Sequence, residues 1–168
     1  NFKCNDNQIR EVIKTRQGIY EHSSIIFRNV ANYRNQFTYA QDLDLYLRLS
    51  NKGKMYCLNE VLLRCKVNTN GITVQKRYLQ MQYQSEAYRH YNLGNKIQQD
   101  INIYDSKIRK IVWGLAAPFY AKYIKTRTKN ANNLTQYVYL MIVIFLYPPI
   151  LHDYARKIYL KFYNLLKI

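Results

Sequence analysis

Two carboxylates, Asp42 and Asp44, stand two residues apart and are the side chains best placed for chemistry. The stretch 41–49 predicts a helix, because its apolar residues recur at helical spacing. Acids in the first turn complement the positive end of the helix dipole, and Gly53 supplies the left-handed residue that ends such a helix. Asp44 can pair with Arg48, four residues later. Carboxylates at a helix start could bind a metal ion, take up a proton or simply cap the helix.

Short apolar runs flank this acidic helix and predict the strands of an α/β fold. The runs 24–27, 55–58 and 61–67 are rich in β-branched and aromatic residues, as buried or extended strands are. A second helix is predicted over 74–91, packed back on the sheet. The acidic helix would then begin at the mouth of an α/β sheet, where its carboxylates are exposed.

The order of these signals resembles the C-terminal half of a family 2 glycosyltransferase domain. The resemblance runs from His22 to about Ser85, a little over a third of the chain. The matching segments are His22–Arg28, Tyr33-Arg34, Phe37, Gln41–Leu49, Lys52–Lys54 and Leu62–Arg64. It implies a GT-A fold and inverting transfer of a sugar from a nucleoside diphosphate donor to a glycan or lipid-linked hydroxyl acceptor.

The resemblance also assigns roles to single residues. Asp42 corresponds to the catalytic base, which takes the proton of the acceptor hydroxyl. Similar enzymes usually have glutamate before this residue, so Gln41 is a departure that removes a charge. His22 falls near the acceptor side of the cleft, and Arg64 could point into a diphosphate site. Each of these residues also has a purely structural alternative: Asp42 would cap the helix, His22 would be a polar residue before a strand, and Arg64 would be an exposed strand arginine.

A divalent metal, Mg²⁺ or Mn²⁺, is expected for the complete enzyme, with ligands outside this chain. Asp42 and Asp44 form an Asp-x-Asp string, but a metal motif of that kind belongs on a turn rather than on a leucine-rich helix. The position where similar enzymes often have a metal-ligating histidine is occupied by Asn68, a poor ligand. The three cysteines, Cys4, Cys57 and Cys65, lack metal-type spacing, so no metal site is predicted in this sequence.

The length of 168 residues is short for a complete enzyme of this kind. The chain begins Asn1-Phe2 without a signal-like region, so we expect a piece whose nucleotide-binding half lies upstream. Residues 1–92 would form the C-terminal half of the catalytic domain, and residues 93–168 a helical, basic tail. On this interpretation the chain alone is not expected to transfer sugar.

The basic charge calls for an anionic partner. The net charge is +16, and residues 101–168 contain eleven basic against two acidic residues. A helix starts near Asp105, and Pro118 should kink or end it. The apolar stretch 134–147 is shorter than the roughly 20 residues of a spanning helix, which favours an interfacial one. Residues 154–168 predict an amphipathic helix.

These features predict a peripheral protein bound to an anionic membrane on its cytoplasmic face. A nucleic-acid binder is disfavoured, because the basic residues interleave with long apolar runs rather than forming a polar face. The alternative that stays open is a non-catalytic membrane-surface binding module, in which the glycosyltransferase-like half is a remnant.

Overall fold

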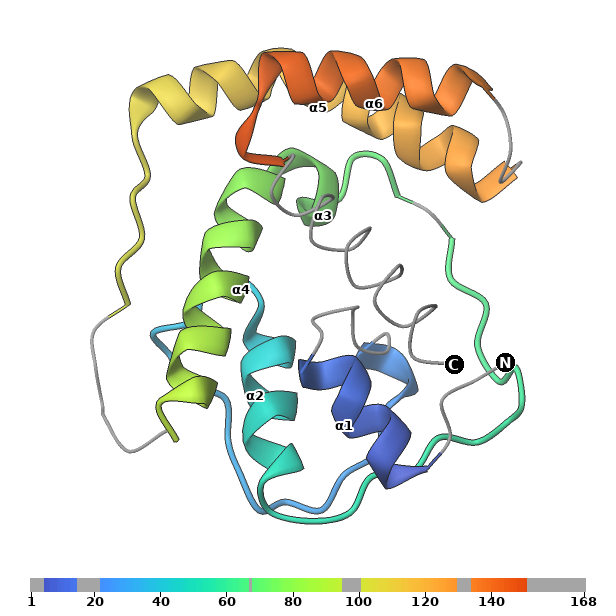
Figure 1. Ribbon diagram of the computed structural model, residues 1–168, viewed down its shortest axis with the longest axis vertical. Coiled ribbons are helices and arrows are strands. Elements are labelled where there is room, and N and C mark those ends of the chain that lie inside the picture. Colours follow the sequence, from blue (N-terminus) through green and yellow to red (C-terminus); the bar gives the residue numbers. More distant parts are fainter. Residues whose placement is uncertain (1–4, 15–21, 67, 95–100, 130–133, 151–168) are drawn as a thin grey trace, which may run out of the picture. The chain divides into compact units, whose positions relative to one another are not determined.

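The structure is a computed structural model that describes residues 5–14, 22–66, 68–94, 101–129 and 134–150 (Figure 1). Every regular element within these ranges is a helix. In chain order they are α1 (Asp6–Lys14), the short 3-10 helix η1 (His22–Ser24), α2 (Gln41–Ser50), α3 (Ile72–Gln75), α4 (Arg77–Asn92), α5 (Lys107–Lys129) and α6 (Leu134–Leu146). The α/β fold expected for the C-terminal part of a GT-A domain is therefore wrong: the described residues contain no strand.

The three predicted strands are irregular chain in the structure. Residues 24–27 begin in η1 and continue without regular structure, and residues 55–58 and 61–66 are also irregular. Ile26 and Leu62, which a buried strand would cover, are exposed. β-propensity reflects the fit of a side chain to a pleated, half-buried surface, so it forms no strand where the segment has no ladder partner.

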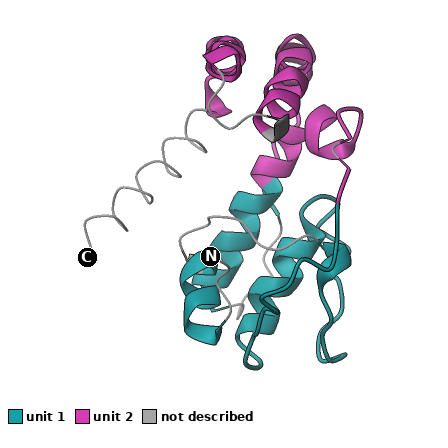
Figure 2. Ribbon diagram, turned by 90° about the vertical axis from the view of Figure 1, so that its right-hand side faces the viewer, with its two compact units in different colours: residues 1–64, 83–102 teal, residues 65–82, 103–168 magenta. Residues whose placement is uncertain are grey.

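The chain divides into two compact units (Figure 2). Unit 1 comprises residues 1–64 and 83–102, and unit 2 comprises residues 65–82 and 103–168. Residues 65–82 thus group with the C-terminal helices rather than with the first 64 residues. Helix α4 contributes residues to both units.

Unit 1 is built around the apolar sides of α1, α2 and α4. Its core contains Ile9, Ile13, Phe37, Leu47, Ala87 and Tyr88. Arg10 joins the first two helices: its guanidinium donates to the carbonyl oxygens of Ser50 at 2.5 Å and Gly53 at 2.8 Å. These carbonyls lie at the negative end of α2, so a cation is stabilising there.

Asp6 completes this junction between α1 and the end of α2. Its carboxylate pairs with Arg10 at 2.7 Å and accepts a hydrogen bond from the Met55 amide at 2.8 Å. The hydrogen bond from Arg10, followed by that from Met55, lowers the pKa of the Asp6 carboxyl below its usual value.

Unit 2 is centred on Trp113 of α5. The indole Nε1 donates to the Val74 carbonyl of α3 at 3.0 Å, and the ring packs edge-on against Tyr120 and Tyr147. Ser106 caps the start of α5, since its hydroxyl accepts from the Arg109 amide at 3.2 Å. Helices α5 and α6 pack against each other.

Pro118 does not end α5, which continues to Lys129. The ring of a helical proline crowds the carbonyl of the residue four positions earlier. That residue is Gly114, and the place where its Cβ would lie is open, so no packed side chain prevents this turn from adjusting to the ring. Of the two predicted outcomes, a kink or the end of the helix, the end is therefore wrong, the kink stays a prediction, and the basic residues after Pro118 belong to α5.

Helix α6 is present as predicted, over Leu134–Leu146. None of the described helices combines the length and the apolar character that crossing a bilayer requires. The amphipathic helix predicted over 154–168 lies outside the described residues.

Candidate functional site

The candidate site is the first turn of α2. Ala40, the residue before the helix, has a left-handed backbone with φ 58° and is buried. A residue with a Cβ adopts this conformation at a cost of about 1–3 kcal/mol, which the surrounding structure must offset. The turn is supported by Gln41, whose side-chain amide donates to the Thr38 carbonyl at 3.2 Å.

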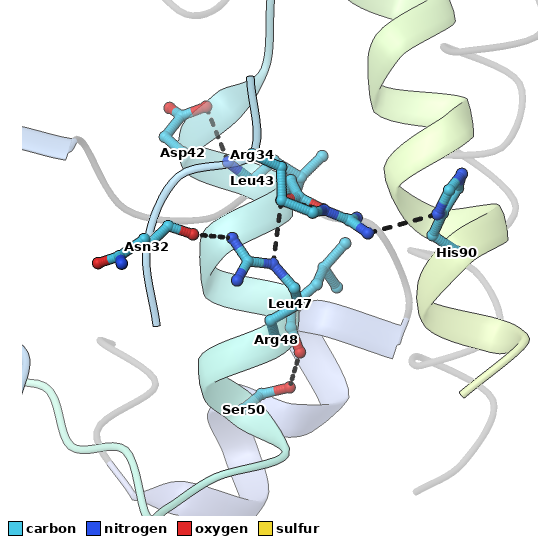
Figure 3. Close-up of polar contacts among 9 residues, drawn as sticks. Asn32, Arg34, Asp42, Leu43, Leu47, Arg48, Ser50 and His90 are labelled. Atoms are coloured by element: carbon cyan, nitrogen blue, oxygen red, sulfur yellow. Dashed lines mark hydrogen bonds and ion pairs between the residues drawn. The ribbon is translucent and has the colours of Figure 1, made fainter. Parts of the chain in front are cut away.

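Asp42 is partly exposed in this first turn (Figure 3). Its Oδ1 accepts a hydrogen bond from the Leu43 amide at 2.8 Å. This bond and the positive end of the helix dipole orient the carboxylate at a place that solvent or a small hydroxyl compound can reach. The geometry is compatible with proton transfer.

Asp44 has the opposite environment, since only 1% of it is exposed. Arg34 holds both carboxylate oxygens, with Nε 3.0 Å from Oδ2 and Nη2 in contact with Oδ1. Arg48 Nε donates to Oδ2 at 3.1 Å. The sequence predicts Asp44 and Arg48 as a surface pair, whereas the structure shows a buried carboxylate between two guanidinium groups.

The two arginines also fasten the loop before α2. Arg48 Nη2 donates to the Asn32 carbonyl at 2.6 Å (Figure 3). The Arg34 guanidinium lies over the Phe37 ring, 4.8 Å from its centroid. Further along, Lys52 donates to the Val30 carbonyl at 2.7 Å. Cationic side chains thus hold the loop around residues 30–34 against α2. This also fixes where the chain enters the first turn of the helix.

His22 is joined to α2 through Tyr46. Its Nδ1 lies 2.5 Å from the Tyr46 hydroxyl, and its Nε2 lies 2.8 Å from the Tyr33 hydroxyl. Tyr46 follows Asp42 by four residues, so the two side chains occupy adjacent turns of one helix side, about 5–6 Å apart at Cβ. The structure therefore brings His22, which precedes α2 by nearly twenty residues, to the side of α2 that carries Asp42.

Tyr33 and Tyr46 are site residues that the sequence analysis did not identify as such. In the sequence, Tyr33 stands in one of the matching segments and Tyr46 lies within the acidic helix 41–49. Tyr46 is in fact buried, but its hydroxyl reaches His22. The four-residue spacing from Asp42 was the signal that could have linked them.

Arg64 lies in the exposed segment 61–66. Within the described part of the chain, no hydrogen bond or ion pair joins it to Gln41, Asp42 or His22. Its role at a diphosphate stays a prediction. Asn68 is used locally, since its side-chain oxygen accepts from the Asn70 amide at 3.0 Å.

The Asp-x-Asp string does not fit a metal site. Both oxygens of Asp44 are bound to guanidinium groups, so Asp44 and Asp42 do not face one ion together. Across the residues that the structure describes, no group of three His, Cys, Asp or Glu side chains could hold a metal. The two aspartates therefore act separately rather than as a pair of metal ligands.

His90 is buried next to Arg34, one of the two arginines that bind the Asp44 carboxylate. Arg34 Nη1 lies 3.5 Å from its Nδ1, and the Phe37 ring packs edge-on at 5.9 Å. Burial, with the nearby charges of Arg34 and Arg89 as further causes, lowers the pKa of His90 below its usual value. His90 is consequently favoured as the neutral imidazole.

No family model, curated protein or solved structure matches this chain. The resemblance to family 2 glycosyltransferases rests on the residues between His22 and Ser85, and the candidate site rests on the geometry around the start of α2.

Proposed function

We propose that this chain is part of an inverting glycosyltransferase that uses a nucleoside diphosphate sugar, with Asp42 as the general base. The observation that supports this proposal most is the contrast between the two aspartates of α2. Asp42 is accessible and oriented by one amide, while Asp44 is committed to two arginines that fix the helix. The accessible one is also the residue that the family resemblance assigns to the base.

In the proposed reaction, the acceptor hydroxyl lies against the Asp42 carboxylate. Its oxygen attacks the anomeric carbon while its proton passes to Asp42. The bond between that carbon and the diphosphate oxygen breaks on the opposite face, and its electron pair leaves with the nucleoside diphosphate. Inversion follows from attack opposite the leaving group. Holding the carboxylate in one orientation contributes by placing base and hydroxyl in contact.

His22 and Gln41 belong to the acceptor side in this proposal. Two tyrosine hydroxyls hold the His22 ring in place. The exposed rings of His22 and Tyr33 then form a polar aromatic surface on the side of α2 that carries Asp42. Such surfaces suit sugars, whose rings pair apolar C–H faces with hydroxyl groups. Arg64 is proposed to contact the diphosphate, as the resemblance implies.

The reaction is proposed to take place at the cytoplasmic face of a membrane, with the protein bound peripherally. The acceptor would then be a glycan or lipid-linked compound, and the product a surface polysaccharide or glycolipid. The basic charge of residues 101–168 supports attraction to an anionic surface.

The test is sugar transfer by the complete enzyme from a panel of radiolabelled nucleotide sugars to a lipid extract. We expect one donor to give a labelled product whose anomeric configuration is inverted relative to the donor, as judged by NMR. Retention of configuration would contradict the mechanism through Asp42 as base.

A non-catalytic membrane-surface module is the second candidate. It is favoured by the uncovered apolar sides of α5 and α6. Vesicle binding by the complete protein, with no transfer from any donor in the panel, would support this candidate over the enzyme.

A further inference from the structure

Helices α5 and α6 each leave an apolar stripe uncovered. The exposed apolar residues of each helix recur at intervals of three and four positions, which places them along one side. They are Ile108, Ile111 and Leu115 on α5, and Leu134, Tyr137, Val138, Met141 and Phe145 on α6. Phe145 is 84% exposed and Ile108 is 73% exposed, so most of the surface of these apolar residues is open to solvent.

The buried sides of the two helices converge on the Trp113 cluster. Trp113 contacts Val74 of α3 and Tyr147, which directly follows α6. Val143, on the side of α6 opposite Met141, is fully buried. The exposed stripes therefore lie on the outer sides of the pair, away from the core of unit 2.

Positive charge borders the apolar stripe of α5. Helix α5 carries seven Lys or Arg residues and no acid, and α6 carries no charge at all. Lys107 and Lys110 are exposed at the start of α5, and Lys122 and Lys125 near its end, so the apolar stripe of α5 lies between two basic groups. Long lysine side chains can rest on apolar surface while their ammonium groups reach a polar layer.

We propose that this outer face of α5 and α6 docks onto an anionic phospholipid bilayer. Its apolar stripes would enter the boundary between headgroups and acyl chains, and its lysines would contact the phosphates of the headgroups. A nucleic acid would match the charges but leave the apolar stripes in water. The proposal rests on the peripheral membrane binding proposed above, for which it names the surface, but it does not depend on the sugar-transfer chemistry at Asp42.

The apolar contribution is tested with the full chain and vesicles of phosphatidylcholine, with or without phosphatidylglycerol. Met141→Ser/Phe145→Ser should weaken sedimentation with the anionic vesicles by at least about tenfold, because two large apolar groups no longer enter the bilayer. The matched control is Val61→Ser/Leu62→Ser, which changes two equally exposed apolar residues of unit 1 and should bind normally. Circular dichroism checks that both variants remain helical.

The charge contribution is tested with Lys107→Gln/Lys110→Gln/Lys125→Gln. Removing three charges at the surface should weaken anionic-vesicle binding by about 100-fold. Its control, Arg28→Gln/Lys54→Gln/Lys66→Gln, removes the same charge from exposed positions elsewhere and should cost far less. Unchanged binding of either face variant, or equal loss in its control, would overturn the proposal. So would light scattering that shows the wild type as a dimer and the Met141/Phe145 variant as a monomer, because a second copy would then cover the face.

Discussion

At the start of α2, two aspartates separated by one residue differ in exposure and in hydrogen-bond partners. Asp42 accepts one backbone hydrogen bond and remains accessible, whereas Asp44 lies between Arg34 and Arg48 with almost no exposure. Removing the charge of the first should affect chemistry, and removing that of the second should affect folding. This contrast makes the two positions natural controls for each other.

Asp42→Asn should reduce sugar transfer by the complete enzyme about 10²–10⁴-fold, since asparagine cannot take the acceptor proton. Asparagine keeps the shape of the side chain and an oxygen that can accept from the Leu43 amide, so the melting temperature and donor affinity should change little. Initial rates, donor binding and thermal melting are measured on the same preparation.

The control for this variant is Asp105→Asn, which alters an exposed aspartate just before α5. It should transfer sugar at the normal rate. Near-normal turnover of Asp42→Asn, or an equal loss in the Asp105 variant, would remove Asp42 from the role of base.

In unit 1, the buried Asp44 carboxylate ties the loop that carries Arg34 to helix α2. Asp44→Asn leaves Arg34 and Arg48 facing each other without their shared carboxylate. Breaking a buried ion pair by removing one partner costs about 3–5 kcal/mol, and the partial exposure of both arginines favours the lower figure. Urea unfolding followed by circular dichroism should show this loss, compared with less than about 1 kcal/mol for Asp42→Asn. Equal stability of the two variants would mean that the cluster contributes little.

His90 should make the stability of unit 1 depend on pH. Its pKa is lowered in the folded state, so below about pH 6.5 the unfolded chain binds more protons than the folded one. The free energy of unfolding should fall as pH decreases from about 6.5 towards the folded pKa, by at most about 1.4 kcal/mol per pH unit. His90→Gln, which cannot titrate, should show a flatter profile below about pH 6.5. An equally steep profile in that variant would assign the effect to another group.

Helical periodicity allowed several elements to be predicted from the sequence. The acidic helix over 41–49 and the apolar helix from Leu134 are present. The single helix predicted over 74–91 is divided in the structure, because Val74 belongs to α3 and α4 begins at Arg77 after a break at Lys76. In each case the signal is local, because residues three and four apart meet on one side of a helix. The helix start predicted near Asp105 is also a local signal, since serine is a preferred capping residue and Ser106 caps α5.

What could not be predicted depends on contacts between distant residues. The expected strands required a sheet that the described chain does not contain, since propensity alone cannot supply a ladder partner. Arg34 reaches Asp44 from a loop without regular spacing, and His22 reaches Tyr46 across 24 positions. Because Arg34 also binds its carboxylate, Asp44 belongs to a buried ion pair rather than to the surface pair that the sequence predicts.

At the scale of the whole molecule, the net charge of +16 should attract any polyanion, so charge alone does not identify the partner. Binding to duplex DNA by charge alone should fall steeply between about 50 and 200 mM salt, because it depends on counterion release. Binding to anionic vesicles should persist further, because apolar burial by α5 and α6 is not screened by salt.

Salt titrations with fluorescent duplex DNA and with anionic vesicles, run on the same protein, separate the two. The Met141→Ser/Phe145→Ser variant sharpens the comparison, since it removes apolar surface without changing charge. It should lose vesicle binding at physiological salt and leave DNA binding at low salt unchanged. Sequence-selective DNA binding that survives physiological salt would instead make nucleic acid the partner of the basic face. Parallel salt curves for DNA and vesicles would show that the stripes on α5 and α6 contribute nothing to recognition, whatever their exposure.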